Sequence, residues 1–254
     1  MARIGRRSVL AAIGALPFAA RTAVAEPAWQ LRWSPVPSRD GLGGFEGIED
    51  DRANSHPGVK HIYVQGDAYR WDMHKRDRDT APDRQRNEVR GMRANGVPLV
   101  LDNNETWKFT YSMFIPNTLK ATSSFTHIMQ TKMPGLGSSP ITVMSLRRQG
   151  TTPTIEFKVT EGDTLVGNTD LTPLWDRWID TEVEIHIGDA GTGYVRWAIH
   201  SGGSTVLDVT KSGVDTWLDD RVRPKWGIYR SLSDAAQIQD CHLLLKNLKG
   251  YQLI

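Results

Sequence analysis

Three stretches of the chain combine charged, amide and phenolic side chains at the alternate spacing of a β-strand. The first stretch is Arg86-Asn87-Glu88-Val89-Arg90. Successive side chains of a strand point to opposite faces, so Arg86, Glu88 and Arg90 share one face. Guanidinium groups bind carboxylates in bidentate geometry, and a glutamate between two arginines can hold their planes in place. A solvated strand face would also explain this stretch if it stood alone.

Two other stretches supply further polar side chains. Lys225, Gly227 and Tyr229 alternate along one of them, and we expect the glycine to let a ligand approach the backbone. Gln130 and Lys132 alternate along the other. If the three strands are neighbours, they form a groove that holds four cations, an amide and a phenol. Such a groove suits an acidic polymer.

The first 25 residues predict an export signal of the twin-arginine type. Arg6-Arg7 precedes an apolar stretch from Ala11 to Ala20, and Ala23-Val24-Ala25 is a small-x-small cleavage site before Glu26. The apolar stretch is too short to span a bilayer. We therefore expect a bacterial periplasmic or secreted protein that has no membrane association once the signal is removed.

The composition excludes some classes of function. The 254 residues include 31 Lys+Arg and 29 Asp+Glu, but residues 26–254 alone hold 27 against 29. The basic balance thus comes from the signal and gives no indication of nucleic-acid binding. The one cysteine, Cys241, excludes an internal disulfide. It alternates with Leu243 and Leu245, which predicts a buried, inert thiol.

Alternation with a period of two residues dominates residues 26–254, which we interpret as one domain. The clearest run extends from Trp107 to Ile115, and shorter runs are separated by turns rich in Gly, Asn and Asp. Residues 37–58 are poor in apolar side chains and predict a surface loop, whereas residues 174–178 give the longest helix-like piece. This pattern predicts an all-β fold, a β-sandwich or β-jelly roll of two antiparallel sheets, with one sheet curved around a concave substrate groove.

The polar stretches resemble a known group of enzymes. Residues 86–90 resemble the Arg-[Ser/Thr/Asn]-Glu-Leu-Arg strand of jelly-roll alginate lyases, and residues 225–229 resemble their Lys-Ala-Gly-Val-Tyr strand. Gln130 stands where those enzymes carry Gln-Ile-His. Residues 83–88, 127–132 and 226–230 are more similar still to glucuronan lyases (polysaccharide lyase family 20) within the wider heparin-lyase-like group. The likeness extends from Trp71 to Ile254.

The resemblance implies β-elimination on a 4-linked polyuronate, which leaves a C4–C5 unsaturated uronate end. It implies that Tyr229 transfers the proton and that Gln130 helps to neutralise the uronate carboxylate, beside which charge develops. Arg86, Arg90, Lys132 and Lys225 are then the substrate-binding cations. In glucuronate the C5 proton and the C4 oxygen lie on the same side, so one tyrosine can act as base and then as acid. The similarity to glucuronan lyases favours a glucuronan-like polymer.

The histidine of the Gln-Ile-His pattern is replaced here by Lys132. His127 lies three residues before Gln130, and on a regular strand it faces the core. His74 alternates with Arg70 and Asp72 and is the preferred partner of Tyr229, although the sequence leaves open which of the two histidines assists it. We expect no cofactor for the chemistry. The resemblance allows a structural calcium ion, with Asp240 and acids of residues 45–51 as candidates, but no metal-loop spacing assigns its ligands.

Two other functions fit parts of the pattern. Asp180, Glu182 and Glu184 share one strand face, as the carboxylates of a glycoside hydrolase would, although a solvated convex face explains them better. A non-catalytic carbohydrate-binding module would need the groove but not Tyr229. In all three candidate functions the partner is a polysaccharide, and we expect the protein to be a monomer.

Overall fold

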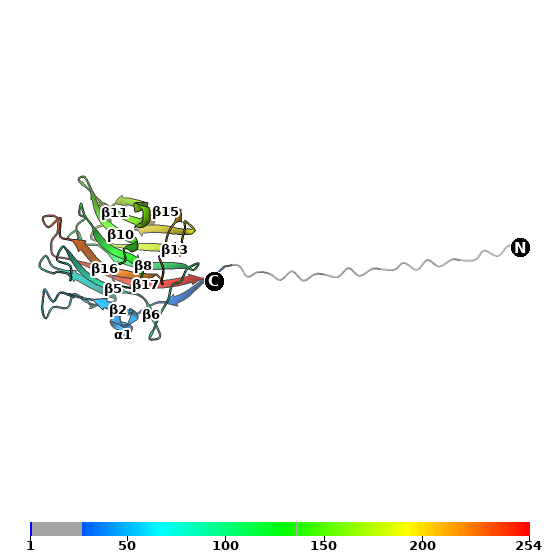
Figure 1. The fold of residues 1–254 in the computed structure, drawn as a ribbon, viewed down its shortest axis with the longest axis horizontal. Coiled ribbons are helices and arrows are strands. Elements are labelled where there is room, and N and C mark those ends of the chain that lie inside the picture. Colours follow the sequence, from blue (N-terminus) through cyan, green and yellow to red (C-terminus); the bar gives the residue numbers. More distant parts are fainter. Residues whose placement is uncertain (2–26, 136) are drawn as a thin grey trace.

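The structure is a computed structural model that describes residue 1, residues 27–135 and residues 137–254. It consists of two antiparallel sheets packed as a sandwich, which confirms the predicted fold class (Figure 1). The predicted signal of residues 1–25 lies, apart from Met1, outside the described residues. Within the described chain, no helix is long and apolar enough to cross a bilayer.

The two sheets have different roles. The seven-stranded sheet, here called the groove sheet, has the order β12 (Thr164–Asp170), β11 (Thr152–Val159), β10 (Pro140–Gln149), β9 (Thr126–Lys132), β16 (Arg223–Ser231), β5 (Arg84–Arg90), β2 (Gly47–Glu49). The other sheet, here called the back sheet, has the order β15 (Ser204–Val214), β14 (Gly193–Ser201), β13 (Trp178–His186), β8 (Thr106–Phe114), β17 (Cys241–Leu253), β4 (Ala68–Met73), β3 (Ile62–Gln65). β1 (Trp29–Trp33) also pairs with β17.

The remaining elements are short. They are a two-stranded ribbon of β6 (Arg93–Ala94) and β7 (Val97–Pro98), the helix α1 (Pro37–Asp40) and the 3₁₀-helices η1 (Gly41–Gly44), η2 (Glu161–Asp163) and η3 (Thr172–Leu174). The helix-like piece expected at residues 174–178 is therefore only the 3₁₀ turn η3, which ends where Trp175 becomes extended.

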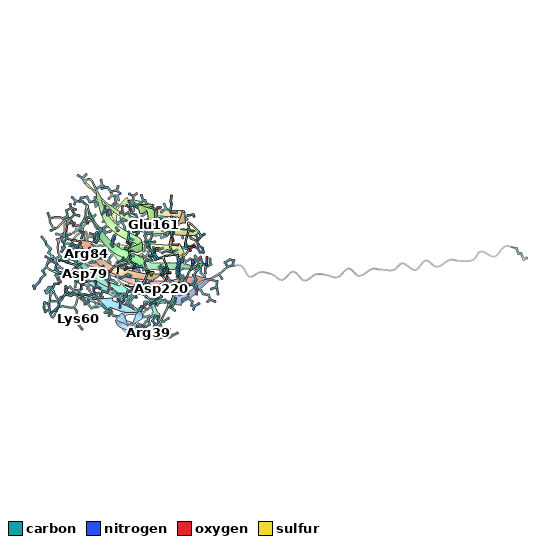
Figure 2. All side chains as sticks on the ribbon, viewed as in Figure 1. Arg39, Lys60, Asp79, Arg84, Glu161 and Asp220 are labelled. Atoms are coloured by element: carbon teal, nitrogen blue, oxygen red, sulfur yellow. The ribbon has the colours of Figure 1, made fainter. Side chains whose placement is uncertain are left out.

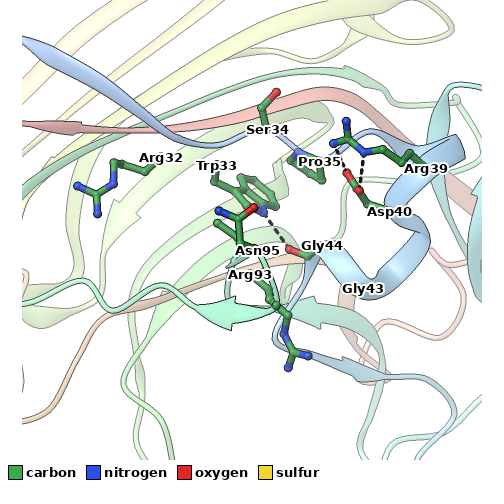
Figure 3. A pocket seen from close by; sticks show the side chains of 12 residues that line it. Arg32, Trp33, Ser34, Pro35, Arg39, Asp40, Gly43, Gly44, Arg93 and Asn95 are labelled. Atoms are coloured by element: carbon green, nitrogen blue, oxygen red, sulfur yellow. Dashed lines mark hydrogen bonds and ion pairs between the residues drawn. The ribbon is translucent and has the colours of Figure 1, made fainter.

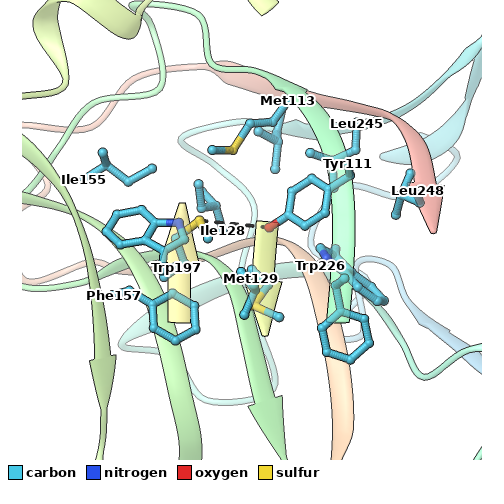
Figure 4. Packing of buried hydrophobic residues seen from close by; sticks show 14 of the residues in the cluster. Tyr111, Met113, Ile128, Met129, Ile155, Phe157, Trp197, Trp226, Leu245 and Leu248 are labelled. Atoms are coloured by element: carbon cyan, nitrogen blue, oxygen red, sulfur yellow. Dashed lines mark hydrogen bonds between the residues drawn. The ribbon is translucent and has the colours of Figure 1, made fainter. Parts of the chain in front are cut away.

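The core lies between the inward faces of the two sheets. Trp107, Phe109, Tyr111 and Met113 alternate along β8 and are buried, as the period-two pattern predicts. Figure 4 shows side chains of both sheets packed in this layer. Cys241 belongs to the same cluster, which confirms the prediction of a buried thiol, and burial raises the pKa of this thiol to about 11.

The order of the groove sheet brings distant parts of the sequence together. β16, near the end of the chain, lies between β9 and β5. In this register Tyr229 is opposite Arg86, and Lys225 lies between Arg90 on one side and Gln130 on the other. The three polar stretches found in the sequence are thus adjacent strands.

A β-bulge in β9 changes which face its residues occupy. His127 pairs with Ser145 and Met129 pairs with Met144, so Ile128 is an extra residue in β9. Ile128 and Met129 consequently both point into the core, although they are neighbours in the sequence (Figure 4). Because the bulge shifts the alternation by one residue, His127 and Gln130 share the groove face. The expectation that His127 faces the core is therefore wrong.

Two further expectations are wrong. Residues 37–58 are not only a surface loop, because they contain β2, the edge strand of the groove sheet. Gly227 is buried, so its backbone does not offer the open approach to a ligand that the sequence suggested. With φ at 143°, a Cβ there would lie 2.2 Å from the carbonyl oxygen of Asn87 and 3.0 Å from the Trp71 ring, so glycine is required by packing.

Candidate active site

A cavity of about 680 Å³ lies on the outer face of the groove sheet. It contains six of the seven site residues predicted from the sequence, and the exception is His74. The lining residues are Glu49, Arg52, Arg84, Arg86, Arg90, Gln130, Lys132, Gly135, Gly137, Ser138, Ser139, Pro140, Arg223, Lys225 and Tyr229. Seven of these side chains are cationic and one is a carboxylate. A cavity with this excess of positive charge attracts a polyanion.

Lys225 is held in a buried ion network and does not project freely into the cavity. Its Nζ lies 2.7 Å from a Glu49 oxygen and 2.8 Å from a Glu88 oxygen, and its side chain is 2 % exposed. Burial of a charged group is costly unless a partner compensates it, and here two carboxylates do so. Lys225 therefore stabilises the site instead of offering the free substrate cation that the sequence suggested.

Glu49, which the sequence analysis considered only among the candidate calcium ligands, is shared by several cations. Besides Lys225, its carboxylate lies 3.2 Å from Arg90 and 3.5 Å from Arg86. Burial opposes ionisation of Glu49, but Lys225 and then Arg86 and Arg52 outweigh that effect and lower its pKa to about 2. The sequence contained one signal for Glu49, because a site with so many cations needs a nearby acid to balance their charge.

Arg86 joins the ion network to the phenol. Its guanidinium lies 3.0 Å from Asp79 and 3.4 Å from Glu88, and its Cζ is 3.9 Å from the centre of the Tyr229 ring. Burial works against the charged form, but the surrounding carboxylates and Tyr229 raise the pKa of Arg86. The guanidinium therefore remains a fixed positive charge against the tyrosine.

Tyr229 is also bonded at its hydroxyl. Arg84 Nη1 donates a 2.7 Å hydrogen bond to the phenolic oxygen, and the side chain of Tyr229 lines the cavity. The neighbouring Asp83 carboxylate and the Tyr229 hydroxyl both raise the pKa of Arg84. Two guanidinium groups thus contact Tyr229, one at the oxygen and one at the ring. A negative charge on the phenolic oxygen would be stabilised by both.

Gln130 and Lys132 line the cavity from β9. Gln130 Nε2 donates a 2.6 Å hydrogen bond to Glu88 Oε1. A primary amide carries two N–H donors, so the second is free for a ligand. Lys132 Nζ donates to the backbone oxygen and the hydroxyl of Ser138. Among residues 27–135 and 137–254, it is the cavity cation that forms no ion pair with a carboxylate.

His127 lies beside Tyr229, where the bulge in β9 directs it. The ring centres are 5.7 Å apart, and the Phe125 ring contacts both, at 4.9 Å from His127 and 5.0 Å from Tyr229. His127 Nδ1 is 2.7 Å from Ser145 Oγ. Burial, followed by the positive charges of Arg147 and Arg86, lowers the pKa of His127 to about 3. The imidazole is therefore neutral at ordinary pH.

His74 does not lie with Tyr229 and Gln130. It follows β4 of the back sheet, and its Nδ1 lies 3.2 Å from Asp77 Oδ2. Its ring packs against His56 and His61, with ring centres 4.8 Å and 5.5 Å away. The alternation in β4 is the one that the sequence predicts, but β4 belongs to the back sheet. Proximity in sequence to Arg86 therefore does not bring His74 into the cavity.

Three cavity arginines were not selected from the sequence. Arg52 comes from the β2–β3 connection and pairs with Asp79 at 2.6 Å, and Arg223 begins β16 and pairs with Glu46 at 3.1 Å. Arg84 could have been found, because it precedes Arg86 by two residues and shares its face. Within the described chain, none of the nine tryptophans lines this cavity.

The acids proposed as calcium ligands are used in other ways. Glu46 pairs with Arg221 and Arg223, Glu49 belongs to the ion network, and Asp50 bonds His61. Asp240 accepts a 2.7 Å hydrogen bond from the backbone N–H of Lys75. Calcium takes six to eight oxygen ligands, and these carboxylates do not converge on a common point in residues 27–135 and 137–254.

The carboxylates of the hydrolase alternative lie on the outer face of the back sheet. Glu182 pairs with Arg196, Glu184 accepts a 2.7 Å hydrogen bond from Tyr194, and Asp180 accepts a 2.6 Å hydrogen bond from Ser112. The intervening residues of β13 are buried in the core. The three acids are therefore on the solvated face that the alternation predicted and are not in the cavity.

A second cavity, of about 550 Å³, lies near β1, α1 and the β6–β7 ribbon (Figure 3). Arg39 pairs with Asp40 there, and the Trp33 indole donates a hydrogen bond to the backbone oxygen of Gly44. Its lining holds no tyrosine, histidine, lysine or cysteine in the described residues, and its only carboxylate is paired. The first cavity is accordingly the better candidate for chemistry.

Comparisons with known proteins identify the family and the fold. Residues 41–245 match a family model described as polysaccharide lyase. No curated protein matches the sequence. Similar solved structures include an endo-β-1,4-glucuronan lyase from the fungus Trichoderma reesei, with 14 % identity, a TM-score of 0.53 and coverage of 82 % of this chain and 91 % of that chain.

Two alginate lyases are comparably similar. The enzyme from Zobellia galactanivorans has 13 % identity, a TM-score of 0.51 and coverage of 88 % of this chain and 94 % of that chain. The enzyme from Aplysia kurodai has 14 % identity, a TM-score of 0.52 and coverage of 82 % of this chain and 92 % of that chain. At such low identities the likeness establishes the fold alone.

The ion network leads to a prediction about pH and stability. The folded pKa of Glu49 is depressed, so its stabilisation is fully present above the unfolded pKa of about 4.5 and is lost as the pH falls towards 2. Glu49→Gln should therefore cost roughly 2–3 kcal/mol of unfolding free energy at pH 7. Urea unfolding of both proteins at several pH values should show this difference shrinking below about pH 4.5.

The control is Glu161→Gln, which changes an exposed carboxylate in η2 that has no ion pair in the described chain. It should alter the unfolding free energy by less than about 0.5 kcal/mol at every pH. A Glu49→Gln difference that stays constant from pH 7 to pH 3 would contradict the role assigned to the charge.

Proposed function

The chain belongs to the polysaccharide lyase family, and we propose that it cleaves a 4-linked polyuronate, with a glucuronan-like polymer preferred, by β-elimination in the cavity of the groove sheet. The observation that carries the proposal is the environment of Tyr229, where Arg84 bonds the hydroxyl and Arg86 lies over the ring. The cationic cavity around it suits a chain of carboxylates. The similarity in fold to a glucuronan lyase is consistent with this choice of polymer.

The reaction begins with removal of the C5 proton of the uronate. Tyr229 reacts as the phenolate, and its oxygen takes this proton. The electron pair of the C5–H bond forms the C4–C5 double bond as the C4–O4 bond breaks. The phenolic proton then passes to the departing O4, which leaves Tyr229 ready for the next cycle. One residue can act as base and acid because the proton and the leaving oxygen of β-glucuronate lie on the same side of the ring.

Negative charge develops next to the substrate carboxylate, and the site must stabilise it. The second N–H of Gln130 and the ammonium of Lys132, which has no ion pair in the described chain, are suited to bind that carboxylate. Arg86 and Arg90 add positive charge from β5, while Glu88 holds Gln130 and Arg86 in position. Lys225 acts one step further away, because it orients Glu49 and Glu88.

We assign the assisting role to His127 in place of His74. Its neutral imidazole packs near the Tyr229 ring and is bonded to Ser145. It therefore acts as a positioning residue that orients the phenol and contributes no charge of its own. His74, which bonds Asp77, is separated from the cavity lining.

The substrate class is tested by incubation with glucuronan, alginate, heparin and polygalacturonate, with ultraviolet absorbance of the new double bond as the readout. We expect the highest rate on glucuronan and none on the carboxyl-reduced polymer. Activity should fall as salt rises, because screening weakens the attraction between the cavity and the polyanion. Equal rates on the reduced polymer would rule out a polyuronate substrate.

Tyr229→Phe tests the assignment of the proton-transfer group. It removes one hydroxyl and retains the ring, so packing should change little. Turnover should fall at least about a hundredfold, the lower end for general acid–base catalysis, while substrate affinity should stay within a few-fold. Tyr194→Phe is the matched control, since Tyr194 also has a bonded hydroxyl but lies on the back sheet next to Glu184. A near-full rate for Tyr229→Phe would refute the mechanism.

His127→Asn tests the positioning residue. Turnover should fall by about tenfold or more with little change in KM, because the phenol loses its support while the binding cations remain. The pH–rate profile of the parent should show no step near pH 6.5, since His127 titrates near 3. His200→Asn, on the back sheet, should retain full activity. A step near 6.5 that vanishes in His127→Asn would contradict the assigned protonation state.

A further inference from the structure

Three histidines and one aspartate from two loops converge outside the catalytic cavity. His56 and His61 lie in the β2–β3 connection, and His74 and Asp77 lie in the β4–β5 connection. Each offers one ligand atom, and these atoms all lie within 4.8 Å of one another. The chemistry of the proposed lyase reaction uses none of these four side chains.

Asp77 lies between the imidazoles. Its Oδ1 is 3.1 Å from His56 Nδ1, and its Oδ2 is 3.2 Å from His74 Nδ1 and 3.4 Å from His61 Nε2. The side chains of His61 and Asp77 are 0 % and 3 % exposed, whereas those of His56 and His74 are partly exposed. The cluster therefore has a buried floor and an accessible outer side through which an ion can enter.

His61 supplies an independent indication of a ligand. Its Nδ1 is 2.7 Å from Asp50 Oδ1, which makes this nitrogen the donor and leaves Nε2 with a lone pair. Nε2 is buried, points towards Asp77 and has no hydrogen-bond partner among residues 27–135 and 137–254. Buried polar atoms are rarely left unsatisfied. A carboxylate that fixes one nitrogen of an imidazole while the other is unpartnered is the usual surrounding of a metal-binding histidine.

We propose that His56, His61, His74 and Asp77 bind one zinc ion. Imidazole and carboxylate are zinc ligands, and four protein ligands give the closed tetrahedral set of a structural site. Zn–N bonds of about 2.0–2.1 Å hold ligand atoms about 3.4 Å apart, so the four side chains need to close in by roughly an ångström. Calcium is disfavoured because it takes oxygen ligands in higher number.

The ion would join the β2–β3 connection, which supplies Arg52 to the cavity, to the β4–β5 connection, which supports the cavity from behind. Asp79 follows Asp77 by two residues and pairs with both Arg52 and Arg86. Figure 2 shows Lys60, which precedes His61, together with Asp79 and Arg84 towards the same end of the sandwich. Zinc at this point stabilises the connections that precede β3 and β5, at a distance from the reacting atoms.

The test uses untagged protein loaded with zinc and then dialysed against metal-free buffer. Elemental analysis should find about one zinc per chain, and the cobalt-loaded protein should show the visible absorption of tetrahedral Co²⁺. Zinc at about a hundredfold excess over Kd should raise the melting temperature by roughly 5–10 °C. Calcium should cause no comparable rise.

Four variants test the ligand set. His56→Gln and His74→Gln change partly exposed ligands and should weaken zinc binding by about a hundredfold or more. Asp50→Asn changes the carboxylate that bonds His61 Nδ1 and should weaken zinc binding by about ten- to hundredfold. The control, His200→Gln, should bind zinc like the parent. A parent chain without zinc or a melting shift, or zinc binding that is unchanged in both His56→Gln and His74→Gln, would overturn the proposal.

Discussion

The groove sheet depends on the compensation of charge around Lys225. This buried ammonium is fixed between Glu49 and Glu88, and these two acids in turn bind Arg86, Arg90 and Gln130. Removing one member would leave the others charged in a poorly solvated place, so the network behaves as one unit. The network therefore fixes the orientation of Arg86, Arg90 and Gln130 in the proposed site.

The network also divides the cations by role. Those near the sheet surface are neutralised by carboxylates and act as a scaffold, whereas Lys132 has only Ser138 as a partner in the described chain. Arg84 is paired with Asp83 at the surface but still donates to Tyr229. A sheet with so many like charges would be unstable without its acids, and a sheet fully neutralised by acids would not attract a polyanion. The observed excess of cations meets both requirements.

The loops at one end of the sandwich add a second constraint. The β2–β3 and β4–β5 connections carry the histidine cluster, and they also carry Arg52, which lines the cavity, and Asp79, which pairs with Arg52. Asp79 accepts from Arg86, so a shift of the β4–β5 connection would be transmitted to the guanidinium over Tyr229. Rigid loops at this end therefore matter for geometry at the phenol, even though they lie outside the reaction.

The sequence by itself determined the strands, their buried faces and the polar residues of β5, β9 and β16, because side-chain alternation is a local property of the backbone. It could not determine which strands pair, so His74 was assigned to the groove although β4 lies in the back sheet. Nor could alternation reveal the bulge at Ile128, which moves His127 to the groove face. The network of Glu49, Lys225 and Glu88 was decided only by the tertiary structure, since its members are up to 176 residues apart and meet through strand order and burial.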